Sequence, residues 1–266
     1  MVDTDGLYLA EISLHGLIRG RDMELGRDAD TGGQTRYVVE LARAAAEQPG
    51  VERVELFTRR LVDPALPDDY AVPRETIGER AAIVRIDDGT PEYLPKEKLW
   101  DLVDDYVDAM VAHLHAQERL PDVLHSHYAD AGYIGARISH IFGIPLLHTG
   151  HSLGRIKRLR LLAAGMSEAT IEARFAMSRR VAAEELTLAS AVRIITSTHQ
   201  EIEEQYGRYN YHPVDRMTVL PPGTDLSAFR PPDGTEADAP LADELARFFR
   251  EPDKPLVVVL ARPVPR

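Results

Sequence analysis

Short apolar runs alternate along this chain with longer segments in which apolar residues recur at every third or fourth position. The apolar runs predict β-strands at residues 6–14, 51–58, 81–86, 122–127, 144–150, 192–198 and 217–223. The periodic segments predict helices around 38–45 and over 98–117, 130–142, 167–189 and 200–207. Repeated alternation of strand and helix is typical of parallel βαβ units. The pattern therefore predicts an α/β fold with a doubly wound, Rossmann-like parallel sheet.

The pattern changes near the end of the chain. Residues 230–240 are rich in Pro, Gly, Asp and Ala, which predicts a linker. A short predicted helix at 241–249 and a strongly apolar predicted strand at 254–262 follow. Because a lone parallel strand cannot bury both of its faces, we expect 1–230 to form one domain and 231–266 to be a linker and the first strand of a truncated second domain. Alternatively, this strand joins the edge of the first sheet.

Composition and charge narrow the classes of partner. The 266 residues carry a formal net charge of −12, which argues against nucleic acid or an anionic membrane surface as the main partner. The sequence contains no cysteine, so disulfides and thiolate metal sites are excluded. The N-terminus lacks the basic region and long apolar run of a secretory signal, and no apolar stretch approaches the length of a membrane span. These features indicate an acidic cytoplasmic protein.

Two adjacent glycines, Gly32 and Gly33, stand between an acidic loop and a predicted helix. The loops that follow strands are where ligands bind in open α/β sheets. Thr31 and Gln34 have the spacing of a helix capping box, which alone would explain the start of a helix. One tight turn rarely demands two glycines, and exposed amides at a helix N-terminus bind anions or sugar hydroxyls. We therefore favour the approach of a ligand over capping alone, although the G-x-G-x-x-G pattern of dinucleotide-binding proteins is absent.

Four cations follow the predicted strand at 144–150. Arg155, Lys157, Arg158 and Arg160 lie within six residues of an otherwise acidic chain. Lysine and arginine in a loop between a strand and a helix suit an anionic ligand such as phosphate. For any single one of these cations, a solvated helical face is the more ordinary explanation. Their position after a strand end favours at least one of them as a ligand contact.

Two histidines lie two positions apart on the predicted strand at 122–127. His125 and His127 point the same way and could act as metal ligands. No carboxylate or third histidine occurs at a matching spacing, so the pattern favours a core or sugar-contacting role. We therefore expect no metal and no cofactor.

Other charged residues have ordinary structural explanations when each is taken alone. Lys96 lies in a proline-flanked loop before a predicted helix, where a surface lysine is common. Arg179 and Arg180 precede Glu184 and Glu185 by four or five positions, a spacing typical of ion pairs within a helix.

Taken together, seven segments resemble sucrose-phosphate synthases, which belong to the retaining GT-B glycosyltransferases of family 4. In chain order they read "ISLHGLIRGRDMELGRDADTGGQTRYVVELARA", "YLPKEKLW", "HSHYADAGY", "TGHSLGRIK", "RRVAAEELTLASA", "TSTHQEIEEQYG" and "VLPPGTDLSAF". The resemblance covers roughly residues 5 to 266 and follows the order of the family's motifs. The same broader group includes sucrose synthase and mannosylfructose-phosphate synthase.

The resemblance implies two facing Rossmann-like domains, of which the N-terminal one binds the acceptor and the C-terminal one binds the nucleotide sugar. The implied reaction transfers glucose from UDP-glucose to fructose 6-phosphate and yields sucrose 6-phosphate and UDP, with retention at the anomeric carbon. Such a transferase needs no enzyme nucleophile, because the leaving diphosphate is thought to deprotonate the incoming hydroxyl. A site of glycines, hydroxyls and cations is consistent with catalysis by positioning and electrostatic stabilisation.

The resemblance also implies roles for individual residues. Gly33 and His151 match positions at the reaction centre, where the glycine loop lies near the acceptor and the leaving diphosphate and His151 contacts the transferred glucose. The positions that match acceptor-binding residues are Gly32, Gly33, Gln34, Lys96, Tyr128, Ser152, Lys157 and Arg180, with Arg179 as the alternative to Arg180 for the phosphate. Arg262 matches an arginine that binds the diphosphate of the nucleotide sugar.

The chain departs from the family's pattern after Arg262, since the following lysine and the ribose-binding glutamates downstream are absent. We therefore expect these 266 residues alone to have no transferase activity and to bind fructose 6-phosphate weakly; turnover of UDP-glucose by the purified chain would contradict this. Two alternatives stay open. One is an enzyme like sucrose synthase, which uses unphosphorylated fructose, or like mannosylfructose-phosphate synthase. The other is a phosphosugar-binding module without catalysis.

Overall fold

The computed structural model describes residues 6–226, 229–231, 234–235, 240–249, 251 and 254. The chain divides into two compact units, Met1–Pro221 and Pro222–Arg266, and each is described by itself. The second unit contains the helix α7 (Pro240–Ala246), where the sequence predicts one. The predicted strand at 254–262 falls almost entirely outside the described residues.

The first unit is built on one eight-stranded sheet. Its strands are β1 (Leu7–Ile12), β2 (Val51–Arg59), β3 (Arg74–Thr76), β4 (Ala81–Ile86), β5 (Val123–His127), β6 (Leu146–Thr149), β7 (Arg193–Thr196) and β8 (Met217–Val219). They lie in the order β3-β4-β2-β1-β5-β6-β7-β8, and β3 alone is antiparallel to its neighbour. The predicted α/β fold with a doubly wound sheet is therefore confirmed.

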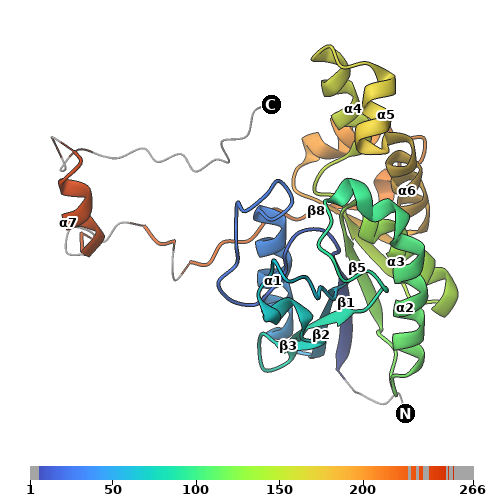
Figure 1. Ribbon diagram of the computed structural model, residues 1–266, viewed down its shortest axis with the longest axis horizontal. Helices are drawn as coiled ribbons and strands as arrows, with labels where there is room; N and C mark the ends of the chain where they lie inside the picture. The colour runs from blue at the N-terminus through green and yellow to red at the C-terminus, as the bar shows by residue number, and fades with distance from the viewer. Residues whose placement is uncertain are drawn as a thin grey trace. The chain divides into compact units, whose positions relative to one another are not determined.

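Helices connect the strands and cover both faces of the sheet (Figure 1). The α-helices of this unit are α1 (Gly33–Ala46), α2 (Val103–His115), α3 (Tyr128–Phe142), α4 (Gly154–Ala163), α5 (Glu168–Phe175) and α6 (Met177–Ser190). Shorter helical turns are η1 (Asp68–Ala71), η2 (Lys96–Asp101), η3 (Glu201–Gln205), η4 (Tyr206–Arg208) and η5 (Val214–Arg216). No helix among the described residues is both long enough and apolar enough to cross a membrane.

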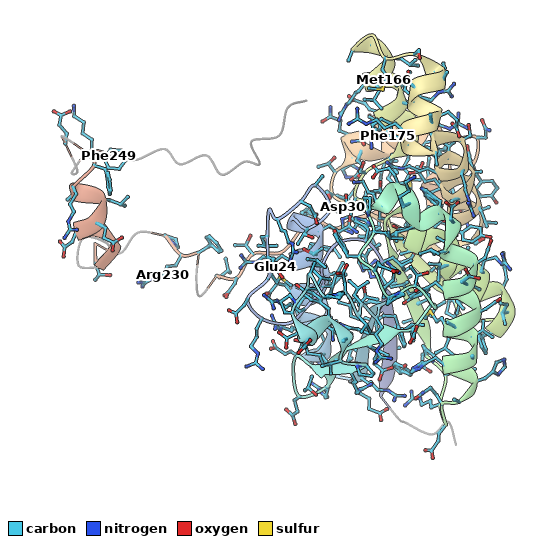
Figure 2. The ribbon with its side chains drawn as sticks, viewed as in Figure 1. Glu24, Asp30, Met166, Phe175, Arg230 and Phe249 are labelled. Carbon is cyan, nitrogen blue, oxygen red and sulfur yellow. The ribbon has the colours of Figure 1, made fainter. Side chains whose placement is uncertain are left out.

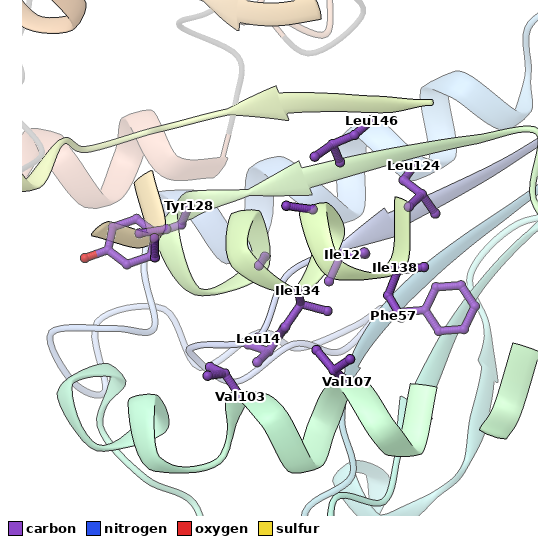
Figure 3. Packing of buried hydrophobic residues seen from close by; sticks show 14 of the residues in the cluster. Ile12, Leu14, Phe57, Val103, Val107, Leu124, Tyr128, Ile134, Ile138 and Leu146 are labelled. Carbon is purple, nitrogen blue, oxygen red and sulfur yellow. The ribbon is translucent and has the colours of Figure 1, made fainter. Parts of the chain in front are cut away.

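Two hydrophobic layers hold the helices to the sheet. Because successive strand residues face opposite sides, Ala10 and Ile12 of β1 face α2 and α3, whereas Leu9 and Glu11 face α1. The layer under α2 and α3 includes Ile12, Phe57, Val103, Val107, Ile134 and Ile138 (Figure 3). The layer under α1 includes Val38, Val39, Ala42, Val54, Leu56 and Ile83. Each large apolar side chain buried in this way contributes about 1.5–3 kcal/mol.

Three predicted helices differ from the observed ones. The predicted helix at 98–117 is a 3₁₀ turn, η2, followed by α2, because Leu102 leaves helical geometry with φ −113° and ψ −8°. The predicted helix at 167–189 is divided into α5 and α6 by Ala176, whose φ is +45°. The predicted helix at 200–207 consists of the π-helical turn η3 and the 3₁₀ turn η4. The strand β3 was not predicted, because its three residues, Arg74 to Thr76, include no apolar side chain.

Candidate functional site

The candidate site lies at the carboxyl ends of β1, β5 and β6. The chain proceeds from β1 toward β2 and β4 on one side, and from β5 toward β6 and β7 on the other. The order of strands therefore reverses between β1 and β5, which is where open α/β sheets bind ligands. The loop between β1 and α1, the start of α3, the loop between β6 and α4, η2 and the start of α6 all contribute residues here.

The loop that precedes α1 is held by side-chain contacts other than the predicted capping box. The N-cap residue is Gly32, and no side chain caps the helix. Thr31 Oγ1 instead accepts a hydrogen bond of 3.1 Å from the amide of Leu17. Asp28 Oδ1 accepts bonds of 2.8 and 2.7 Å from the amides of Asp30 and Thr31. The capping-box prediction was therefore wrong, because Thr31 ties the loop to the segment after β1.

The start of α1 is open at Gly33. Gly33 is exposed, and a Cβ atom added there would meet no atom within 4 Å. The Nε2 atom of Gln34 is buried without a hydrogen-bond partner among the described residues. The amide of Thr35 donates to the backbone oxygen of Gly32 at 3.1 Å, whereas the amides of Gly33 and Gln34 have no acceptor within the helix and are available to a ligand.

Lys96 and Lys157 face each other across one carboxylate. Lys96 Nζ contacts Asp30, and its amide donates to Asp30 Oδ2 at 2.8 Å. Glu97 Oε1 lies 3.6 Å from Lys96 Nζ and 3.5 Å from Lys157 Nζ. Burial lowers the pKa of Lys157, and the nearby charges of Arg180 and Lys96 lower it further. Asp30 and Glu97 match the two lysines in charge, but the ion pair of Lys157 is the 3.5 Å contact with Glu97 alone, so its ammonium keeps donors for an added anion.

Arg180 is buried at the centre of a polar cluster. Its guanidinium donates to Glu184 Oε1 at 2.9 Å and to the backbone oxygen of Ser152 at 2.8 Å, and it lies 4.6 Å above the ring of Tyr128. Glu184 also accepts bonds of 2.9 and 3.0 Å from the amide of Gly154 at the start of α4. The predicted ion pair within the helix is confirmed for Arg180 and Glu184, and the same arginine also orients the loop that carries Ser152.

The other cations that the sequence singles out lie elsewhere. Arg179 is exposed and pairs with Asp101 at 3.2 Å, so the structure separates it from Arg180. Arg155 and Arg158 pair with glutamates at 2.6 and 2.7 Å, and Arg160 is an exposed residue of α4. Arg262 lies outside the described residues.

A cavity of about 420 Å³ adjoins the lysines. Its walls include Asp30, Lys96, Lys157, Arg174 and Phe175, and the Lys157 ammonium lies 3.9 Å from the centre of the Phe175 ring. Figure 2 labels Asp30 and Phe175, which come from the loop before α1 and the end of α5. A larger cavity of about 750 Å³ lies near the amino ends of β2 and β4, away from the edge of the sheet where ligands bind.

Tyr128 and His151 are held in left-handed backbone conformations, with φ of +78° and +56°. Residues other than glycine rarely adopt such angles, and they cluster at functional sites. His151 Nε2 lies 3.1 Å from His127 Nδ1, and burial lowers the pKa of His151 to about 3. The imidazole of His151 is therefore neutral and can exchange hydrogen bonds with sugar hydroxyls.

Several residues that organise the site were not predicted from the sequence. Asp30 and Glu97 position Lys96 and Lys157, but nothing in an isolated acidic residue shows which cation it will meet. Glu11 was missed for a similar reason. It has no matching spacing to these histidines in the sequence, and the pairing of β1 with β5 brings it beside His125 and His127.

Comparison with known sequences places the chain among glycosyltransferases. A sequence profile of Glycosyltransferase Family 4 matches residues 31–228. The chain is 40% identical to a probable sucrose-phosphate synthase of Solanum tuberosum, in an alignment 320 residues long. It is 39% identical to probable sucrose-phosphate synthase 2 of Arabidopsis thaliana, in an alignment 316 residues long. Each alignment covers 98% of this chain and 30% of the relative, so the chain spans under a third of the length of these relatives.

Comparison with solved structures agrees with the sequence motifs. A sucrose-phosphate synthase of Thermosynechococcus elongatus superposes with a TM-score of 0.67 and 28% identity, over 87% of this chain and 52% of that one. The catalytic domain of starch synthase IV of Arabidopsis thaliana shares the fold, with a TM-score of 0.53 and 12% identity over 86% of this chain and 54% of that one. The resemblance inferred from the sequence is therefore confirmed.

Proposed function

Because this chain belongs to Glycosyltransferase Family 4, we propose that it is the acceptor-binding part of a hexosyltransferase that transfers glucose from UDP-glucose to fructose 6-phosphate. The products are sucrose 6-phosphate and UDP, with retention at the anomeric carbon. The activity is proposed for the whole protein, since the chain spans 30% of the length of its curated relatives.

The observation that carries the proposal is the convergence of three cations. Lys96 and Lys157 share Glu97, while Arg180 lies near enough to lower the pKa of Lys157. Ser152 adds a hydroxyl that Arg180 holds in place. A dianionic phosphate would satisfy these donors through charge-assisted hydrogen bonds, and an uncharged fructose would not.

In the proposed reaction the chain's residues position the acceptor. The cations hold the phosphate, and the first-turn amides near Gly33 face the acceptor and the leaving diphosphate at the positive end of the α1 dipole. The fructose hydroxyl oxygen attacks the anomeric carbon of glucose, the bond from that carbon to the diphosphate breaks, and the diphosphate takes the hydroxyl proton. Positioning and electrostatic stabilisation supply the rate enhancement.

Calorimetric titration of the purified chain with fructose 6-phosphate, mannose 6-phosphate and fructose tests the acceptor. We expect fructose 6-phosphate to bind, and fructose to bind more weakly by roughly 10- to 150-fold per charge-assisted bond lost, each worth about 1.5–3 kcal/mol. Lys157→Met should lower the affinity for fructose 6-phosphate by a similar factor and leave the affinity for fructose unchanged.

Arg179→Met is the matched control, because it removes an exposed cation of α6 that pairs with Asp101, and it should bind as the unchanged chain does. Arg180→Ala is a poor probe, since it leaves the buried Glu184 unpaired, which costs about 3–5 kcal/mol of stability.

Equal affinities for fructose and fructose 6-phosphate would contradict the proposal and favour an enzyme of the sucrose synthase type. Tighter binding of mannose 6-phosphate would contradict the acceptor assignment. Binding of fructose 6-phosphate without glucosyl transfer by the whole protein would favour a phosphosugar-binding module.

A further inference from the structure

Three potential metal ligands converge on the face of the sheet that α1 covers. Glu11 of β1 and His125 and His127 of β5 each offer one ligand atom, and these atoms lie within 4.8 Å of one another. The register of the two strands places Glu11 directly beside His125. Glu11 and His127 are 0% exposed and His125 is 7% exposed, so the group is closed to bulk water.

Three polar atoms of this group lack hydrogen-bond partners among the described residues. Both carboxylate oxygens of Glu11 and the Nε2 atom of His127 make no hydrogen bond in the part of the chain that the structure describes. A buried polar atom left unpaired costs about 1–3 kcal/mol, and more if it is charged. Protonation of Glu11 would remove its charge but leave these atoms without partners. A bound cation would satisfy all three residues at once.

The two histidines are prepared as ligands by their other ring nitrogens. His127 Nδ1 lies 3.1 Å from His151 Nε2, and His125 Nε2 lies 2.9 Å from Thr149 Oγ1. Partners of this kind fix the orientation and tautomer of a metal-binding imidazole.

We propose that Glu11, His125 and His127 bind a divalent cation of the zinc class, with water as a further ligand. Two imidazoles and one carboxylate suit Zn²⁺ and Co²⁺, whereas Mg²⁺ and Ca²⁺ prefer oxygen ligands. Bonds of about 2.0–2.2 Å place the ligand atoms of a tetrahedral site about 3.3 Å apart. The observed group therefore needs only small side-chain movements to close around an ion.

The ion would act through neighbouring side chains, away from the acceptor phosphate. Tyr37 of α1 packs the edge of its ring against His127 and His151, with ring centres 6.0 and 5.2 Å apart. Fixing His127 would therefore fix His151 and the first turns of α1. The site is a positioning element for the start of α1 and the β6–α4 loop, and it goes beyond the proposed transfer reaction.

Zn²⁺ titration of the metal-free full chain against a chromophoric chelator tests the site. We expect one Zn²⁺ per chain, a higher Tm on binding, and no competition from Mg²⁺. Glu11→Leu should weaken binding at least tenfold and remove the Zn²⁺-dependent rise in Tm. Without metal this variant should be no less stable than the unchanged chain, because it removes an unpaired buried carboxyl group. His199→Gln, which alters an exposed histidine, should bind Zn²⁺ normally.

Two further measurements keep the outcome clear. Co²⁺ bound to the unchanged chain should give the visible absorption of a four-coordinate ion. If Glu11→Leu does not fold, Glu11→Gln takes its place in the titration. The proposal is overturned if the unchanged chain binds no stoichiometric Zn²⁺, if the Glu11 variants bind it equally well, or if His199→Gln loses it. Titration with fructose 6-phosphate is a separate measurement, so failure of this site and failure of the proposed acceptor can be told apart.

Discussion

Gly33 and Gly150 illustrate two different reasons for a glycine in this site. A Cβ atom at Gly150 would lie 2.5 Å from the hydroxyl of Tyr206, so the fold itself requires glycine there. A Cβ atom at Gly33 would meet nothing within 4 Å, and glycine in a helix costs roughly 0.5–1 kcal/mol relative to alanine. A glycine that packing does not require is best explained by a ligand that approaches the backbone.

Gly33→Ala should therefore separate stability from binding. We expect the free energy of unfolding to stay constant or to rise by up to about 1 kcal/mol, because the new methyl group is unobstructed and favours the helix. Affinity for fructose 6-phosphate should fall, since the methyl group occupies the path to the first-turn amides. Denaturant unfolding and calorimetry measure the two quantities. Unchanged affinity would mean that no acceptor atom comes close to Gly33.

At the scale of elements, α3 approaches its neighbours closely because it carries small residues. Its buried face includes Ala129, Ala131, Gly132, Gly135 and Ala136. A Cβ atom at Gly132 would lie 2.7 Å from Thr187 Oγ1 of α6 and 3.0 Å from His148 of β6. This packing sets the position of α6, and with it the position of Arg180.

Gly132→Ala should destabilise the fold, in contrast to Gly33→Ala. Overpacking costs about 1–3 kcal/mol, which exceeds the gain in helix propensity of about 1 kcal/mol. Adding Thr187→Ala should recover part of the loss, because it removes the closest atom of α6. The free energy of unfolding from urea titrations checks both variants. A double variant no more stable than Gly132→Ala would show that the contact with Thr187 is not the cause.

The sequence predicts best those elements whose hydrophobic pattern follows from which of their own faces is buried. The apolar residues of α3 recur at helical spacing, and most strands are short apolar runs bounded by loop residues, so each pattern favours one kind of element. The break between α5 and α6 was not predictable, because Ala176 favours helix and its φ of +45° is imposed by the surrounding fold. Likewise the cations of the site follow from their types and positions, and Glu184 follows from its spacing to Arg180, while the contacts of Asp30 with Lys96 and of Glu97 with Lys157 depend on the fold.

At the scale of the whole molecule, the buried hydrophobic residues of the described chain all lie between Tyr8 and Tyr209. They therefore belong to the first compact unit, Met1–Pro221, which also contains the complete eight-stranded sheet. The described residues of the candidate site belong to the same unit. Stability and acceptor binding should thus be properties of this unit.

A chain that ends at Pro221 should unfold with the same Tm as the 266-residue chain, within about 2 °C. The reason is that the removed segment contributes no buried hydrophobic residue among those described, and a loss of 1 kcal/mol would lower Tm by roughly 2–4 °C for a protein of this size. Differential scanning calorimetry of both chains makes the comparison. A markedly lower Tm for the shorter chain would show that residues after Pro221 contribute to the core.

The left-handed residues Tyr128, His151 and Ala176 also bear on protein engineering. Each such backbone angle costs roughly 1 kcal/mol or more relative to glycine, but Tyr128 is buried in the core, where a large side chain contributes about 1.5–3 kcal/mol. A library screened only for heat resistance would therefore favour glycine at Ala176 and keep the side chain at Tyr128. At Ala176 such a change removes a single methyl group between α5 and α6. At Tyr128 and His151 it would erase side chains of the candidate site. Directed evolution of this chain therefore needs a binding screen in every round, because a screen for heat resistance does not measure what these side chains bind.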